Sequence, residues 1–113
     1  MRRGEIYWHR FRSPDKRRPV LILTRTELLS VLSTATVAAL TGTVRDIPSE
    51  VILGPAHGLP KACAANLNNV LTVPKAEIGP FLTLLSDEAM GRVDAALLFA
   101  LGVGERSGNG SLH

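Results

Sequence analysis

Short runs of β-branched, aromatic and leucine residues, separated by polar loops, make up most of the chain. Runs of this length and composition are typical of strands. We predict strands at 5–11, 18–25, 35–43, 50–53 and 63–73, the last of which fits one strand or two. The intervening loops are 12–17, 44–49 and the Gly- and Pro-rich segment 54–62, which cannot be regular. A short helix is predicted at 27–32, and alternation along the third strand places Val37, Ala39 and Thr41 on one face.

The hydrophobic period changes near the C-terminus and predicts a helix there. Apolar residues recur at helical spacing, at Met90, Val93, Leu97, Ala100 and Leu101. Ser86 is placed to cap the start of this helix and Gly102 to end it. Residues 104–113 are poor in apolar side chains and predict a disordered tail, so we expect one domain over 1–103. Several short strands and one terminal helix predict a mainly β fold, a small curled sheet or barrel with a C-terminal α-helix.

Composition restricts the class of protein. The chain has 113 residues, enough for one core, and its 45% hydrophobic and 20% charged residues are ordinary for a soluble domain. The single cysteine, Cys63, excludes an internal disulfide. No apolar run approaches the roughly 20 residues that span a bilayer, and the N-terminus lacks the apolar stretch of a signal peptide. We therefore expect a cytoplasmic protein without a membrane partner.

Positive charge is concentrated at the N-terminal end of the chain. The net charge is +3, but residues 1–25 carry eight basic and two acidic side chains, whereas 26–113 carry five basic and eight acidic ones. This asymmetry indicates an anionic partner for the N-terminal part. The basic residues within 10–18 are Arg10, Arg12, Lys16, Arg17 and Arg18. Interleaved with Phe11, these cations favour binding of single-stranded RNA, although a solvated hairpin loop has the same composition.

Two side chains are candidates for chemistry on a phosphate. Arg18 lies where the basic loop meets an apolar strand, so we expect its guanidinium to be held in place, where it can stabilise a phosphorane transition state. Thr41 ends the third strand, and its hydroxyl could donate to a phosphate oxygen. The alternative is that Thr41 is present only because β-branched residues favour strands.

The remaining polar and reactive side chains give weaker signals. The amides of Asn66, Asn68 and Asn69 could bind RNA or satisfy the backbone of a turn. His9 and His57 could act as bases near neutral pH, but each is better explained as a structural residue. Cys63 is predicted to fill the core. No metal-ligand spacing or phosphate-binding glycine loop is present in the sequence, so we expect neither a metal nor a cofactor.

Three segments in order resemble the MazF/PemK family of toxin endoribonucleases. They are RRGEIYW at the N-terminus, RPVLILT at 18–24 and VAALT at 37–41. Two weaker matches follow, NNVLTVPKAEI at 68–78 and LSDEAMGRVDAALLFALGV at 85–103. The resemblance covers nearly the whole chain, to about residue 103. RPVLILT alone is a weak signal, whereas the ordered set is a specific one.

The resemblance implies an SH3-like small barrel with a C-terminal helix, acting as a homodimer. It implies metal-independent, sequence-specific cleavage of single-stranded RNA, mRNA above all. In this family the ribose 2′-hydroxyl attacks the adjacent phosphate and leaves a 2′,3′-cyclic phosphate and a 5′-hydroxyl. Arg18 matches the family's catalytic arginine and Thr41 its catalytic threonine. The other residues expected to bind RNA are Arg10, Arg12, Lys16, Arg17, Thr43, Arg45, Asn66, Asn68 and Asn69. The expected partner is an antitoxin whose disordered C-terminal segment covers the RNA groove.

The sequence also departs from the family's pattern. The loop at 12–17 is shorter than in many relatives, and Asn68 and Asn69 stand where some relatives have a carboxylate and a glutamine. Because an asparagine cannot act as a base, a base would have to be Arg18, His9 or water.

Two alternative functions remain compatible with the sequence. A DNA gyrase poison related to CcdB would have the same barrel, but such proteins rely on an aromatic residue near the C-terminus, and GERSGNGSLH contains none. A non-catalytic RNA-binding barrel would keep the basic N-terminal region without requiring Arg18 and Thr41 together.

Overall fold

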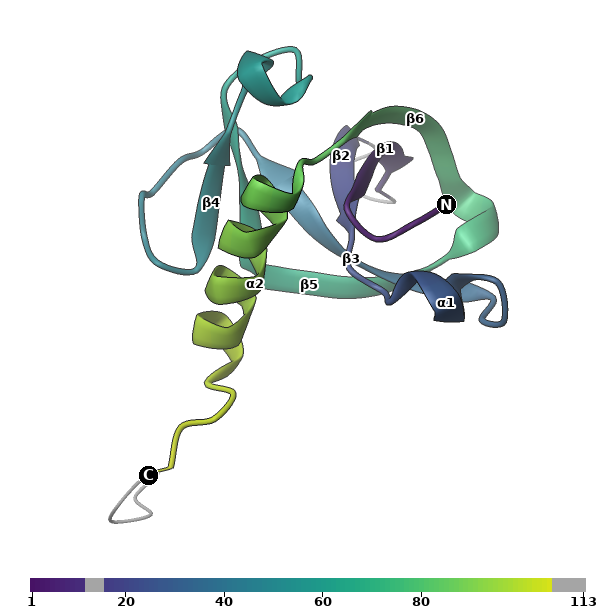
Figure 1. Cartoon of the computed structure of the whole chain (residues 1–113). Helices are drawn as coiled ribbons and strands as arrows, with labels where there is room; N and C mark the ends of the chain where they lie inside the picture. The colour runs from purple at the N-terminus through teal and green to yellow at the C-terminus, as the bar shows by residue number, and fades with distance from the viewer. Residues whose placement is uncertain (12–15, 107–113) are drawn as a thin grey trace.

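Six strands form one antiparallel sheet that curls around two apolar clusters (Figure 1). The computed structural model describes residues 1–11 and 16–106. The strand order across the sheet is β4-β5-β3-β2-β1-β6. The strands are β1 (Glu5–Arg10), β2 (Arg17–Ile22), β3 (Thr34–Thr41), β4 (Glu50–Leu53), β5 (Cys63–Pro74) and β6 (Ile78–Leu84). The helices are α1 (Thr26–Leu29) and α2 (Asp87–Leu101), and the 3-10 turns are η1 (Pro55–His57) and η2 (Lys75–Glu77).

The two faces of the central strands are buried in different clusters. In β2, Leu21 packs in a cluster that includes Val93 of α2. Its neighbour Val20 points to the opposite face and packs in a second cluster that includes Leu29 of α1. Because both faces of β2 are covered, its sequence is a continuous apolar run rather than an alternating one. The predicted mainly β fold with a C-terminal helix is confirmed.

The C-terminal helix begins and ends where the sequence predicts. The Ser86 hydroxyl accepts a hydrogen bond from the Ala89 backbone N–H at 3.2 Å. Gly102 follows the last turn with a φ of 66°, a left-handed conformation that favours glycine. Helix α2 packs against β4 and β5 on one side of the sheet (Figure 1). Within residues 1–11 and 16–106, no helix is long and apolar enough to cross a membrane.

Strand β6 has no counterpart among the predicted strands. Its sequence contains Gly79 and Pro80, residues that usually interrupt strands. However, β6 is an edge strand that pairs with β1 alone, and an edge tolerates proline because its outer backbone groups face solvent. A Cβ atom at position 79 would lie 2.8 Å from the Trp8 carbonyl oxygen, so the close approach of β6 to β1 requires glycine.

Some predicted strand boundaries are wrong by a few residues. The second strand runs from Arg17 to Ile22, because its ladder of pairs with β3 ends at Ile22 and Val37. The first strand ends at Arg10, and the third ends at Thr41 rather than at 43. The helix predicted at 27–32 is the four-residue α1, and 63–73 belongs to the single strand β5.

The Gly- and Pro-rich segment 54–62 is more regular than predicted. It contains the turn η1, in which the His57 N–H donates to the Gly54 carbonyl at 2.8 Å. Pro55 stands at the first position of this turn, where its fixed φ and missing N–H cost little. The predicted tail, 104–113, lies largely outside the described residues.

Candidate functional site

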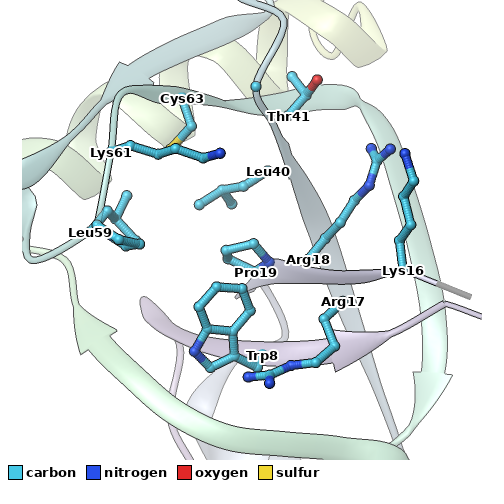
Figure 2. Close-up of a pocket in the computed structure, with 12 residues that line it drawn as sticks. Trp8, Lys16, Arg17, Arg18, Pro19, Leu40, Thr41, Leu59, Lys61 and Cys63 are labelled. Carbon is cyan, nitrogen blue, oxygen red and sulfur yellow. The ribbon is translucent and has the colours of Figure 1, made fainter.

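Arg18 and Thr41 line the same pocket, of about 370 Å³, at one end of the sheet (Figure 2). Strands β2 and β3 are antiparallel and pair Val20 with Ala39. Extending this register by two residues brings Arg18, near the start of β2, opposite Thr41, the last residue of β3. The pocket is lined by Trp8, Lys16, Arg17, Arg18, Pro19, Leu40, Thr41, Gly42, Leu59, Pro60, Lys61 and Cys63.

The pocket has an apolar floor and a cationic rim. Trp8, Pro19 and Leu40 lie along the floor in Figure 2. Lys16 and Arg18 extend into the pocket from one side, and Lys61 extends from the other. Among the described residues that line it, none carries a carboxylate or an imidazole. Such a surface suits a ligand that combines a flat apolar group with a phosphate, as a nucleotide does.

The Arg17 guanidinium covers one face of the Trp8 ring, with its central carbon 4.7 Å from the ring centroid. This cation–π contact anchors the start of β2 to β1, which pairs Trp8 with Pro19. It also fixes an aromatic ring at the edge of the pocket, where a nucleobase could stack.

The Thr41 hydroxyl can donate its proton to a ligand. Its oxygen accepts a hydrogen bond from the Thr43 backbone N–H at 3.1 Å. Because that contact uses a lone pair of the oxygen, the hydroxyl proton stays available for a ligand. The side chain is half-buried, which restricts its motion. A donor in this position can approach a phosphate oxygen held in the pocket.

The expectation that Arg18 is held by its surroundings is wrong. Its side chain is exposed, and it makes no hydrogen bond or ion pair with the residues that the structure describes. The physical reason is the lack of an acidic partner, because none of the described residues that line the pocket with Arg18 carries a carboxylate. A guanidinium without an internal partner keeps its fork of N–H donors free for a phosphate.

The segment that carries Lys61 is anchored on the opposite side of the pocket. His57 Nδ1 accepts the Gly54 N–H at 3.1 Å, and the Thr83 hydroxyl donates to the His57 carbonyl at 3.2 Å. Gly58 has a φ of 87°, and a Cβ there would lie 2.3 Å from Thr83 Oγ1, so only glycine fits. His57 is therefore a structural residue, as expected.

Trp8 and Lys61 are pocket residues that the sequence did not assign to the site. Lys61 is a single basic residue in a Gly- and Pro-rich segment, and Trp8 lies on a strand beside other aromatic residues. The interleaving of aromatic and basic residues was the only available signal for Trp8. Nothing local distinguishes Lys61, because only the folded sheet brings 54–62 opposite β2.

The three predicted asparagines lie on β5, away from the lining of this pocket. The Asn66 side-chain oxygen accepts the Asn68 backbone N–H at 3.0 Å, and the Asn68 amide donates to the Ser49 hydroxyl. These contacts lie where the pairing of β5 with β3 shifts in register, between Ala65 and Val70. Asn69 is exposed on the same strand.

Arg45 is paired with a buried carboxylate. Its backbone N–H and its guanidinium donate to the two oxygens of Glu50, at 3.0 and 3.1 Å, and the Glu50 side chain is completely buried. Much of the positive charge of Arg45 therefore neutralises Glu50. The sequence alone could not indicate this ion pair. Thr43 is exposed in the loop that precedes Arg45.

Arg10 lines a second cavity, of about 280 Å³, next to the first. The two cavities share Trp8 and Arg17, so that the cation–π pair forms the wall between them. His9 also lines the second cavity but is 94% buried, edge-on to Phe11, consistent with a structural role. Arg12 lies outside the described residues.

Cys63 lines the first pocket on the same side as Lys61 and is buried. Burial raises the pKa of the Cys63 thiol, and the nearby Lys61 ammonium opposes this effect. The thiol is thus kept neutral, as expected of a core residue. In the part of the chain that the structure describes, no three His, Cys, Asp or Glu side chains are grouped as a metal site would need.

Comparisons with known proteins identify the family and the fold. The family model for "PemK-like, MazF-like toxin of type II toxin-antitoxin system" matches residues 2–101. "Probable endoribonuclease MazF5" of Mycobacterium tuberculosis (strain ATCC 25618 / H37Rv) is 36% identical over 100 residues, which cover 88% of this chain and 91% of that protein. The solved structure "Endoribonuclease in complex with its cognate antitoxin from Mycobacterial species" matches with a TM-score of 0.82 and 27% identity, over 94% of this chain and 99% of that one. "Mycobacterium tuberculosis toxin MazF-mt6" matches with a TM-score of 0.81 and 30% identity, over 89% and 99%.

Proposed function

The chain belongs to the PemK-like, MazF-like toxins of type II toxin–antitoxin systems and is an endoribonuclease of that family, and we propose that it cleaves single-stranded RNA, chiefly mRNA, at specific short sequences without a metal ion. The observation that carries the proposal is the shared pocket of Arg18 and Thr41. That pocket places a free guanidinium and a free hydroxyl proton beside an apolar floor. The cytoplasm is the compartment in which such a substrate is found.

In the proposed reaction the ribose 2′-hydroxyl attacks the adjacent phosphorus. Negative charge grows on the non-bridging oxygens as the pentacovalent phosphorane forms, and Arg18 and the Thr41 hydroxyl donate to these oxygens. The bond to the 5′ oxygen then breaks, which leaves a 2′,3′-cyclic phosphate and a 5′-hydroxyl. The nucleophile belongs to the substrate, so the reaction needs no metal-activated water. Positioning and charge stabilisation supply the catalysis.

The cationic rim gives the RNA a path across the molecule. Lys16 and Arg17 stand beside Arg18 on the pocket, and Arg10 continues the basic surface into the neighbouring cavity. We assign these three residues, with the predicted Arg12, to contacts with the phosphate backbone. Farther contacts are assigned to Thr43, Arg45, Asn66, Asn68 and Asn69. Of these, Arg45 has the least charge to offer, because Glu50 accepts from its guanidinium.

Mapping the RNA ends that the protein creates tests the proposal. Induced expression in a bacterium should arrest growth and produce RNA 5′-hydroxyl ends that share one short sequence across many transcripts. The control is the Arg18→Ala, Thr41→Ala double variant, which should produce neither effect. Growth arrest without new 5′-hydroxyl ends would contradict the proposal and favour a toxin that acts on a protein target.

An antitoxin is the proposed protein partner, and its disordered C-terminal segment should compete with RNA. The basic rim of the pocket attracts an acidic segment as well as it attracts phosphates, since both are anionic. Saturating antitoxin should therefore lower the affinity for a labelled, non-cleavable RNA by tenfold or more, as measured by fluorescence anisotropy. An unchanged RNA affinity would show that the two ligands occupy different surfaces.

A homodimer is part of the same proposal, and the exposed Leu98, Phe99 and Leu101 of α2 leave apolar surface available for it.

A further inference from the structure

The proposed reaction leaves one proton unassigned, the proton that the departing 5′ oxygen must take up. An alkoxide is a poor leaving group, and a positioned acid typically accelerates such a step by about 10²–10⁴. The described lining of the pocket contains no carboxyl or imidazole group that could supply this proton. Arginine keeps its protons at all ordinary pH values, and the Cys63 thiol, which also lines the pocket, is buried. The two lysines of the pocket, Lys16 and Lys61, are the remaining nitrogen acids.

The two lysines lie on different sides of the pocket. Lys16 stands near Arg18, on the side of the pocket where β2 begins. Lys61 enters from the opposite side, and its ammonium group points into the pocket above the floor formed by Leu40 (Figure 2). In Figure 2 Thr41 lies along the upper edge of the pocket, above the level of the Lys61 and Arg18 head groups.

An in-line displacement places the attacking and leaving oxygens on opposite sides of the phosphorus. Arg18 and Thr41 are assigned to the non-bridging oxygens, which lie between these two. A phosphate held in this way can turn its leaving oxygen toward Lys61, on the side of the pocket away from Arg18. Lys61 is the only cation among the described residues on its side of the pocket, where the other lining side chains are Leu59, Pro60 and Cys63.

The backbone around Lys61 is fixed by the packing of its segment. Leu59 is buried, and its N–H donates to the Gly54 carbonyl at 3.3 Å. On the other side, Cys63 begins β5 and pairs with Leu53 of β4. The backbone of Lys61 therefore lies between two anchored residues, while its exposed side chain can exchange a proton with water.

We propose that Lys61 is the general acid of the reaction, which donates a proton to the leaving 5′ oxygen; this inference rests on the proposed function. The 2′ oxygen forms a bond to phosphorus and loses its proton to water. The P–O5′ bond breaks, its electron pair stays on O5′, and O5′ takes the proton from the Lys61 ammonium. The neutral amine then regains a proton from water, so that the enzyme is restored. Lysine is suited to this cycle because, unlike arginine, it can release and regain a proton.

A substrate with a better leaving group tests this role directly. The probe is an RNA oligonucleotide containing the cleavage sequence, with sulfur replacing the bridging 5′ oxygen at the scissile phosphate. A thiolate leaves without protonation, so its departure needs no acid. Lys61→Met should lose about 10²-fold or more in single-turnover rate on the all-oxygen RNA. On the sulfur-bridged RNA the same variant should react within about threefold of the wild-type rate.

Two further variants separate proton donation from charge. Lys61→Arg keeps the charge but cannot give up a proton, so it should be slow on the oxygen substrate and normal on the sulfur one. Lys16→Met removes a neighbouring cation that attracts the RNA, so at enzyme concentrations below saturation it should slow both substrates by the same modest factor. Equal losses of Lys61→Met on both substrates, no loss on either, or full activity of Lys61→Arg on the oxygen substrate would each overturn the assignment. A wild-type protein that cleaves neither substrate would instead refute the endoribonuclease mechanism itself.

Discussion

A single 2′-deoxyribose at the nucleotide before the scissile phosphate is expected to abolish cleavage. The substitution removes the nucleophile itself, so nothing in the pocket of Arg18 and Thr41 can compensate for it. The same substitution at the following nucleotide should leave the rate within a small factor, since that sugar contributes only the leaving oxygen. Because the proposed reaction uses no metal-bound water, EDTA should leave cleavage of the all-ribose RNA unchanged. Denaturing gels of the labelled oligonucleotides measure both effects.

The products distinguish this mechanism from attack by water. The upstream fragment should carry a 2′,3′-cyclic phosphate, which is detected by its resistance to phosphatase until acid opens the ring. The downstream fragment should be a ready substrate for polynucleotide kinase, because its 5′ end is a hydroxyl. Persistent cleavage of the deoxy substrate, or loss of activity with EDTA, would show that an external nucleophile performs the attack.

The sequence predicts those parts of the fold that are determined locally. Burial explains the apolar run of β2 and the helical spacing of apolar residues in α2, and the structure has both elements. The predicted alternation of β3 is also present, because Val37 and Leu40 lie in different apolar clusters. β6 was not predicted, because Gly79 and Pro80 are residues typical of loops. Only its edge position and its close approach to Trp8 explain why both fit in a strand. Position in the sheet, a long-range property, decides between the two interpretations.

The candidate site is predicted only in part, for a related reason. Arg18 and Thr41 are identified through the family resemblance, and the antiparallel pairing of β2 with β3 explains why they share a pocket. Trp8 and Lys61 are added by the curvature of the sheet, which brings β1 and 54–62 to the same place. For Arg45 the fold weakens a predicted role instead of adding one. Its ion pair with the buried Glu50 carboxylate is visible only in the structure, and it leaves Arg45 with less charge for RNA.

Arg18 and Lys16 should differ in the step that they affect. Both are exposed cations that line the pocket, so either could attract the RNA backbone. Arg18 and Thr41 line the same pocket, where negative charge grows in the proposed reaction, and removal of a donor that stabilises such charge typically costs about 10²–10³ in rate. Arg18→Ala should therefore lose cleavage by this factor and keep RNA affinity within about threefold. Lys16→Ala should lose affinity, flatten its dependence on the logarithm of salt by roughly one unit, and cleave bound RNA at a nearly normal rate.

Single-turnover cleavage and equilibrium binding, each measured at two salt concentrations, separate these outcomes. Binding is measured with an RNA that carries deoxyribose at the scissile nucleotide, so that no variant consumes the ligand. Lys16 is the matched control because it is exposed like Arg18, whereas Arg17 also stacks on Trp8 and its removal would disturb the pocket floor. If Arg18→Ala loses affinity and rate in equal proportion, Arg18 holds the phosphate equally in the ground state and the transition state. Its free guanidinium would then be an anchor, and the stabilisation of the phosphorane would have to come from Thr41 and the remaining cations of the rim.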